Sequence, residues 1–244
     1  MRFRLLSRAA VLLAALALLL TALAGCGGGS SSSSSSSSDN GVADKSPADI
    51  LTATKAASDG ARSVHVAGSI VSDGSPITLD MNLLAGKGGR GQLSESGLSF
   101  ELIQVGKLVY IKGSPAFYKH IGGAAAAQLF QGKWLKASAS DSDFASLSQL
   151  TDLRQLVDQT LENPGGTLTK SGTTTVAGQK VVGITDKSKG GTLYIAATGK
   201  PFPVQISKTG SAGGKITFDR WNGPVTLAAP ANAIDIAQLQ HAGK

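Results

Sequence analysis

Hydrophobic and polar residues alternate along much of the chain, most regularly in the segment "ITLDMNLL". Successive side chains of a strand point to opposite faces, so this segment predicts a strand with one apolar and one polar face. Similar short segments precede and follow it, separated by glycine-containing turns: "SVHVAGSIV", "RGQLSES", "LSFELIQV" and "KLVYIKG". Consecutive strands joined by short turns predict an antiparallel meander.

A second group of strand-like segments occupies the C-terminal part of the chain. These segments are again short and bounded by turn residues: "TLTKSGTTTVAGQKVVGITD", "GGTLYIAAT", "FPVQISKTG" and "GKITFDRW". Lys200-Pro201-Phe202-Pro203 favours an extended backbone where the third segment begins, because a residue before proline avoids the helical region. The pattern therefore predicts two separate groups of antiparallel strands.

Helical spacing of apolar residues appears before the first group of strands and again between the two groups. Residues 46–60 open with Ser46-Pro47, an N-cap followed by proline at the first helical position. Residues 114–131 are rich in alanine and are interrupted at Gly122-Gly123. The short segment "KWLKA" after them predicts a brief strand.

Residues 141–163 predict two short helices that meet near Leu150, with Asp141 and Asp143 as an N-cap region. The order of elements is thus strands, a helical insertion, and strands again. This order predicts an α+β fold in which helices cover the apolar face of one curved antiparallel sheet.

The first 25 residues have the pattern of a secretory signal peptide. Three arginines precede a 12-residue apolar stretch that is too short to span a bilayer comfortably. Leu23-Ala24-Gly25-Cys26 follows and resembles the lipobox of bacterial lipoproteins, which implies cleavage before Cys26 and diacylglycerol on its sulfur. Two acyl chains anchor a protein stably, whereas one does so marginally. The alternative is an ordinary secretory signal that happens to contain a cysteine.

Three regions follow from this pattern. Residues 1–25 are the signal peptide, residues 26–46 are the lipidated N-terminus with its glycine and serine tether, and residues 47–240 are the folded domain. The tether has almost no apolar side chain to bury, so we expect a random coil of about 20 residues with a reach of roughly 25 Å. With Cys26 lipidated, no cysteine remains for a disulfide in the domain.

Composition and charge argue against a nucleic-acid partner. The net charge is +7, and removal of the signal peptide leaves 20 basic against 16 acidic residues, or +4. The lysines form no basic block and show little interleaving with aromatic residues. A weak attraction to anionic lipid or glycan and an ordinary solvated surface both remain compatible with this excess.

Sequence motifs for catalysis or metal binding are lacking. Gly86–Gly91 matches G-x-G-x-x-G, but no helix is predicted after it, so we expect a hairpin loop. His65, His120 and His241 are isolated in the sequence, and His65 belongs to the polar face of its strand. We therefore expect a binding protein without a cofactor or a metal, and not an enzyme.

From about Ile50 to Ile236 the chain resembles the LppX, LprA, LprF and LprG group of actinobacterial lipoproteins. The segments that carry this resemblance are "GKLVYIKGSPAFY", "GKWLKAS", "TLYIAATGKPFPVQISKTG", "KITFDRWNGPVTLAAP" and "ANAIDI". The resemblance implies a fold similar to Lol-type lipoprotein carriers, a half-barrel sheet whose concave apolar face wraps helices around a cavity. It also implies that residues 47–240 bind acyl lipids or glycolipids and transfer them within the cell envelope.

The lipobox predicts that the domain is held by its anchor at the extracytoplasmic face of the cell membrane, and an envelope transporter, not identified by the sequence, is a candidate partner. A second hypothesis is a structural or signalling lipoprotein with a filled core that binds a protein partner. A glycan-processing enzyme is disfavoured, because the sequence shows no pair of catalytic acids.

Strand alternation and helical spacing suggest which residues would line a cavity. Gly68 shares the apolar face of its strand and is the position where a tryptophan is expected to fill the space. The complete set of candidate lining residues is Val66, Gly68, Ile70, Leu79, Met81, Leu83, Phe100, Leu102, Phe130, Leu150, Leu153 and Val157.

Overall fold

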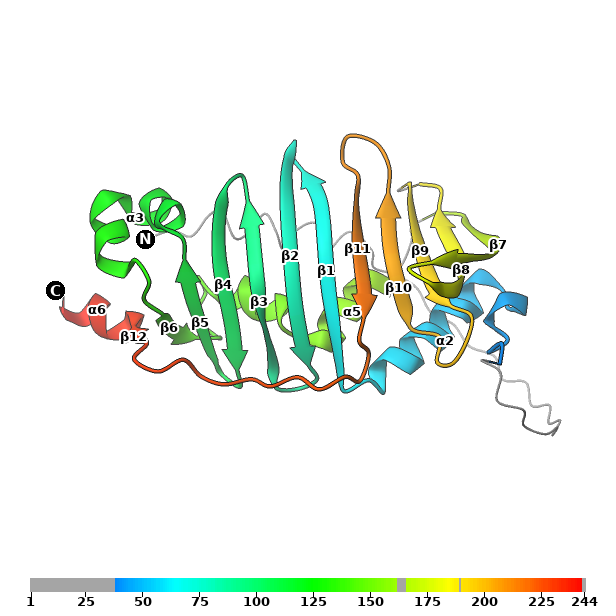
Figure 1. Ribbon diagram of the computed structural model, residues 1–244, viewed down its shortest axis with the longest axis horizontal. Helices are drawn as coiled ribbons and strands as arrows, with labels where there is room; N and C mark the ends of the chain where they lie inside the picture. The colour runs from blue at the N-terminus through cyan, green and yellow to red at the C-terminus, as the bar shows by residue number, and fades with distance from the viewer. Residues whose placement is uncertain (1–37, 162–165, 189, 243–244) are drawn as a thin grey trace.

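The computed structural model describes residues 38–161, 166–188 and 190–242. These residues form an α+β fold around one open twelve-stranded sheet (Figure 1). The order of strands across the sheet is β12-β6-β5-β4-β3-β2-β1-β11-β10-β9-β8-β7, and every neighbouring pair is antiparallel except β12 and β6. The predicted fold class is therefore confirmed.

The strands follow the two groups expected from the sequence. The first group is β1 (Ser63–Ser72), β2 (Ser75–Leu84), β3 (Gly88–Glu95), β4 (Leu98–Val105) and β5 (Leu108–Gly113). The second is β7 (Leu168–Val176), β8 (Gln179–Asp186), β9 (Gly191–Ala196), β10 (Pro203–Lys208) and β11 (Gly214–Asp219). Pairing of β1 with β11 joins the two groups, and the short strands β6 (Leu135–Ser138) and β12 (Ile234–Asp235) complete one end.

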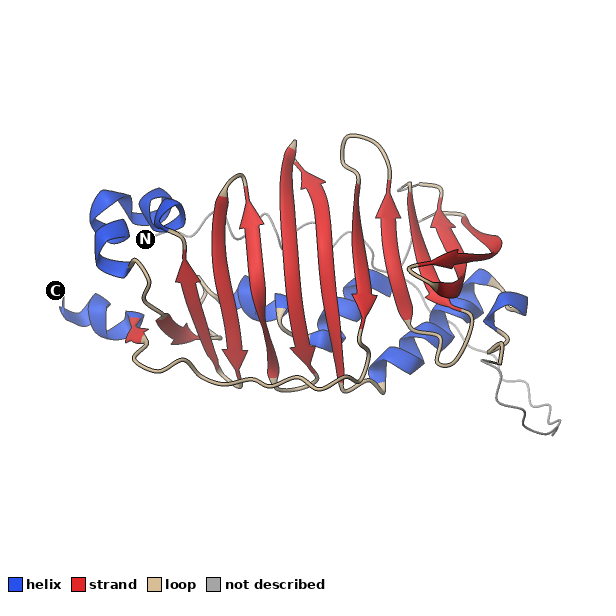
Figure 2. Ribbon diagram, viewed as in Figure 1, coloured by secondary structure: helices blue, strands red, loops and turns tan. Residues whose placement is uncertain are grey.

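Helices cover one face of the sheet and one of its ends. The 3-10 helix η1 (Val42–Asp44) precedes α2 (Pro47–Asp59), and α4 (Ala145–Leu150) precedes α5 (Leu153–Leu161). Figure 2 shows α2 and α5 behind the strands, whereas α3 (Pro115–Phe130) and α6 (Ile236–Ala242) lie beyond the β5–β6 end. None of the helices in the described part of the chain combines the length and hydrophobicity of a bilayer-spanning segment.

The alternation in β1 and β2 defines the inner face of the sheet. Val66 pairs with Met81 and Val64 with Leu83, and all four side chains are buried. They join one apolar cluster with Leu153 and the other buried residues of α4 and α5. Burial of this face against helices is the main stabilising contribution, because each fully buried large apolar side chain contributes about 1.5–3 kcal/mol.

Helix α2 begins as predicted. The Ser46 hydroxyl accepts a hydrogen bond from the Asp49 backbone N–H at 3.2 Å, and Pro47 occupies the first turn. The predicted N-cap at Asp141 and Asp143 is wrong, since no side chain caps α4 and the Asp141 carboxylate accepts from the Asp143 N–H in the preceding turn.

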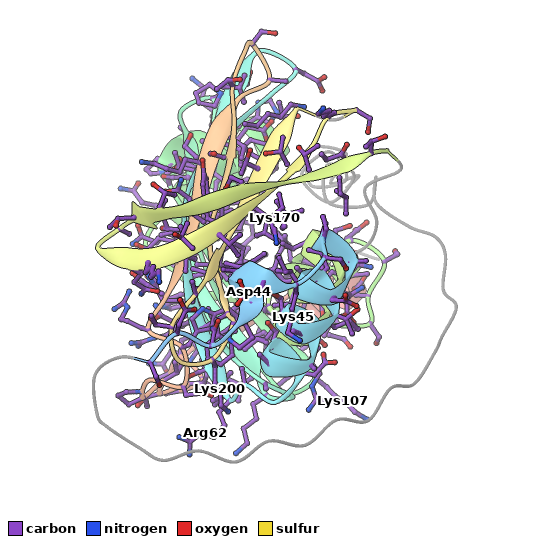
Figure 3. The ribbon with its side chains drawn as sticks, turned by 90° about the vertical axis from the view of Figure 1, so that its right-hand side faces the viewer. Asp44, Lys45, Arg62, Lys107, Lys170 and Lys200 are labelled. Atoms are coloured by element: carbon purple, nitrogen blue, oxygen red, sulfur yellow. The ribbon has the colours of Figure 1, made fainter. Side chains whose placement is uncertain are left out.

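A second apolar cluster lies at the other end of the sheet, where η1 and α2 meet β8 and β9. Val42, Ile50 and Ile195 are almost completely buried there. Lys170 of β7 closes this end by donating hydrogen bonds to the carbonyl oxygens of Ala43 and Lys45 at 2.6 and 2.7 Å (Figure 3).

His65 lies on the outer face of β1, as its place in the alternation predicted, yet it is only 8 % exposed. Its Nδ1 is 2.6 Å from Asp219 Oδ1, and its Nε2 is 3.0 Å from Asp80 Oδ1. The ring therefore joins three adjacent strands, β11, β1 and β2.

The glycine-rich segment after β2 is mostly strand, so the predicted hairpin loop is wrong beyond residues 85–87. Gly88 begins β3, and Gly91 pairs with Met81. A Cβ at Gly91 would lie 2.0 Å from the Asp80 carbonyl oxygen, so the close approach of β2 and β3 requires glycine there. A strand rather than a helix follows the first glycine, which excludes a phosphate-binding loop.

The expectation that a tryptophan at Gly68 would fill a cavity is wrong, because the neighbouring backbone leaves no room for a side chain there. Gly68 has a φ of 153°, and a Cβ there would lie 2.0 Å from the carbonyl oxygen of Lys215 in β11. Any side chain would therefore push two central strands apart.

Gly68→Ala is expected to lower the free energy of unfolding by at least about 1–3 kcal/mol, because the backbone of β11 cannot move without disturbing the sheet. Gly172→Ala is the matched control, since a Cβ at Gly172 would meet nothing within 4 Å. Urea unfolding measures both variants, and an equal loss of stability in the two would contradict this explanation.

Candidate functional site

An apolar cavity lies at the β6 end of the sheet, between α3, the turn before α4, and α6. Its volume is about 450 Å³, within the usual range for small-molecule sites. Its walls are almost entirely apolar, and the residues that line it are Ile121, Gly122, Ala125, Ala126, Leu129, Phe130, Leu135, Asp143, Phe144, Ile236 and Leu239. We call this cavity the end pocket.

The backbone of α3 shapes the end pocket. Gly123 has φ 74° and ψ −171°, so the helix is broken at the glycine pair, as the sequence predicted. The alanines after the break leave space because their side chains are short, and Phe130 closes the far end of the helix. The alanine run does not face the sheet as a whole, since Ala124 and Ala125 are exposed and Ala126 is buried.

Exposed leucines flank the end pocket from both helices. Leu129 of α3 is 53 % exposed and Leu239 of α6 is 41 % exposed. Asp143 is the single ionisable side chain among the lining residues. The walls can therefore accommodate an apolar chain, and the Asp143 carboxylate can accept a hydrogen bond from a donor such as a hydroxyl.

Helix α6 and strand β12 were not predicted from the sequence. Ile234 pairs with Leu135, and the Asp235 carboxylate accepts a hydrogen bond from the Ala237 N–H at 3.0 Å. A hydrogen bond from Lys136 lowers the pKa of Asp235 and fixes the start of α6 against β6. An aspartate followed by apolar residues three apart, Ile236 and Leu239, is the signal that indicates this helix.

A second and much smaller cavity, of about 40 Å³, lies between the inner face of the sheet and the helices. It is lined by residues of β2–β4, α3 and α4, and Ile121 of α3 lines both cavities. Its volume is close to that of one water molecule in the liquid. The cavity that these described residues enclose between sheet and helices is therefore small, with room for little more than a water molecule.

The predicted lining residues do not line one common cavity in the structure. Phe130 lines the end pocket, and Phe100 and Leu150 line the small cavity. Leu79 packs against the main core from a half-buried position, and Ile70 is half-buried near the end of β1. The buried core itself holds Val66, Met81, Leu83, Leu102, Leu153 and Val157.

A groove of about 370 Å³ crosses the sheet over β2–β5, and polar side chains line it together with Leu79, Leu93 and Phe100. Glu101 and Lys112 form an ion pair there at 2.6 Å, and Lys112 lies 5.2 Å from the centre of the Trp134 ring. His65 is adjacent through Asp80, but both of its ring nitrogens face carboxylates, so neither is free to activate a hydroxyl. No group of His, Cys, Asp and Glu in the described residues is arranged to hold a metal ion.

Tyr118 supports the wall of the end pocket from inside. Its hydroxyl accepts a hydrogen bond from the buried Gly113 N–H at 2.9 Å and donates to the Lys133 carbonyl at 3.2 Å. Its ring centre lies 5.7 Å from that of Phe130, which lines the pocket. Burial raises the pKa of Tyr118, and the hydrogen bond from Gly113 offsets part of this rise.

Tyr118→Phe is expected to cost about 1–3 kcal/mol at neutral pH, because it leaves the Gly113 N–H without an acceptor. The raised pKa means that the neutral phenol contributes stability below about pH 10, which is lost as the pH rises through the folded-state pKa. The difference in stability between wild type and variant should therefore shrink in alkaline solution. Urea unfolding at neutral and alkaline pH tests this, with Tyr194→Phe on the outer face as control; a constant difference would contradict it.

Comparisons with known proteins identify the fold. No protein-family model matches the chain, and no curated protein sequence matches it. The crystal structure of LprF from Mycobacterium bovis matches with a TM-score of 0.50 and 18 % identity, over 76 % of this chain and 97 % of that chain. The Mycobacterium tuberculosis lipoprotein LppX matches at 20 % identity and a TM-score of 0.47, over 75 % and 100 % of the two chains. The likeness to LprF confirms the fold that the sequence resemblance implied.

Proposed function

We propose that this protein is a lipid-anchored lipoprotein of the extracytoplasmic membrane face that binds the acyl chain of a lipid or glycolipid in the end pocket. The observation that carries this proposal is the end pocket itself, about 450 Å³ of space with apolar walls and one ionisable side chain. The candidate lining residues thus become those of α3, α6 and β6, with Phe130 retained from the predicted set.

The energetics suit an acyl chain. Each methylene group moved from water into an apolar site contributes about 0.8 kcal/mol, so a chain binds tightly with few polar contacts. Leu129 and Leu239 at the mouth would contact the part of the chain that enters first. We propose that the anchored domain also transfers the bound lipid to an acceptor, such as an envelope transporter.

A binding function is also supported over catalysis. Both imidazole nitrogens of His65 face carboxylates, so neither can activate a hydroxyl, and the fold is similar to that of LprF. The proposal therefore includes no chemical step.

A second candidate function rests on the filled space between sheet and helices. A protein with this packed core would use the exposed leucines of α3 and α6 to bind a protein partner. The two candidates differ in whether a free fatty acid binds the domain.

Titration of residues 27–244 with decanoate, dodecanoate and tetradecanoate tests the proposal. These residues contain every described strand and helix. We expect saturable binding at one site, with affinity increasing up to roughly fourfold for each added methylene. Absence of binding, or affinity independent of chain length, would favour the second candidate.

A further inference from the structure

Four basic side chains from four separate turns lie along one edge of the sheet: Arg62, Lys87, Lys107 and Lys200. All four are exposed. Arg62 precedes β1, whereas Lys87, Lys107 and Lys200 lie in the β2–β3, β4–β5 and β9–β10 connections. We call this set the basic edge. The four are far apart in the sequence, so the lysine spacing gave no sign of it.

Backbone contacts show that these turns are neighbours. The Ala85 N–H donates to the Arg62 carbonyl at 2.9 Å, and the Gly106 N–H donates to the Lys87 carbonyl at 3.0 Å. Arg62, Lys107 and Lys200 all lie at the lower end of the molecule in Figure 3, which corresponds to the lower edge of the sheet in Figure 1. The row follows the long axis of the sheet.

These four charges are not neutralised within the described part of the chain, where none of them forms an ion pair with a carboxylate. Two acidic side chains near this edge already interact with other groups. Asp59, the last residue of α2, pairs with Lys55, and Asp219, the last residue of β11, contacts His65 and Arg220. The opposite edge has mixed charge: Asp73 lies in the β1–β2 turn and Glu95 ends β3, whereas Lys208 ends β10 and Lys215 lies near the start of β11. The molecule is therefore electrostatically asymmetric across its strands.

The tether joins the fold at the same edge. Asp39 pairs with Thr198, and the Asn40 amide donates to the Gly199 carbonyl at 3.1 Å, directly before Lys200. If the 13 residues from Cys26 to Ser38 form the random coil expected from their composition, they would span roughly 20 Å. A chain anchored at Cys26 thus begins its folded part beside the basic edge.

We infer that the basic edge docks on the surface of an anionic lipid bilayer. The inference rests on the proposed anchor for its biological setting, because the anchor places this edge near the membrane. Each basic side chain close to an anionic surface strengthens binding about fivefold. Docking along the row aligns the long axis of the sheet with the membrane, so the end pocket stays beside the bilayer instead of turning away from it.

The test uses residues 27–244, which lack the anchor, and vesicles of phosphatidylcholine with or without phosphatidylglycerol. We expect binding only to the anionic vesicles, and weaker binding at higher salt. Lys87→Gln with Lys107→Gln should reduce the affinity about 25-fold. Lys208→Gln with Lys215→Gln removes the same charge from the opposite edge and should leave the affinity nearly unchanged.

Equal losses in the two double variants, or no binding of the wild type to anionic vesicles, would overturn the inference. Exposed substitutions of this kind change stability by less than about 0.5 kcal/mol, and thermal melting verifies that both variants are folded. Failure here is distinguishable from failure of the proposed function, because fatty-acid titration uses no vesicles and cell fractionation reports on the anchor alone.

Discussion

Cys26→Ala is expected to move the protein from the membrane fraction of cells to the soluble fraction. The lipobox, which lies outside the described residues, predicts two acyl chains on this cysteine, and a protein that lost both would lose its hydrophobic attachment. The described residues offer no spanning helix to replace it. The basic edge alone would provide only a salt-sensitive association.

Fractionation with a salt wash measures this effect. Ser32→Ala in the tether is the control and should leave the protein in the membrane fraction. A Cys26→Ala protein that stays in salt-washed membranes would show that the anchor lies elsewhere.

Ala125→Trp is expected to weaken fatty-acid binding by roughly 30-fold. Ala125 lines the end pocket from an exposed position on α3, so an indole there can enter the pocket without disturbing the core. Displacing two or three methylenes of the ligand costs about 2 kcal/mol, which corresponds to that change in affinity.

Ala124→Trp provides the matched control, because Ala124 is exposed on the same helix but does not line the pocket. It should bind fatty acid as the wild type does. The same titration measures both variants, and equal affinities would place the ligand outside the end pocket.

The inner face of the sheet was predictable because it depends on local alternation. Leu79, Met81 and Leu83 follow a period of two, and a one-residue shift would expose all of them. The cap of α2 and the break of α3 were also local, since Ser46 with Pro47 and the glycine pair act on the adjacent backbone.

The location of free volume could not be predicted in the same way. Alternation identifies an apolar face, but whether helices fill the space above it depends on how distant segments pack. Leu153 and Val157 fill that space, and the end pocket forms where α3 meets α6, more than 100 residues apart. Gly68 and Gly91 likewise looked like small side chains or turns, whereas their role is to let neighbouring strands approach.

Native mass spectrometry of residues 27–244, purified from cells without detergent, tests the central claim most directly. The account predicts a population carrying one non-covalent adduct, which organic extraction removes and which contains acyl chains. It also predicts that the adduct is depleted in Ala125→Trp and retained in Ala124→Trp. A wild-type spectrum showing only the bare chain, with no adduct after incubation with tetradecanoate, would contradict the claim that this fold binds an acyl lipid.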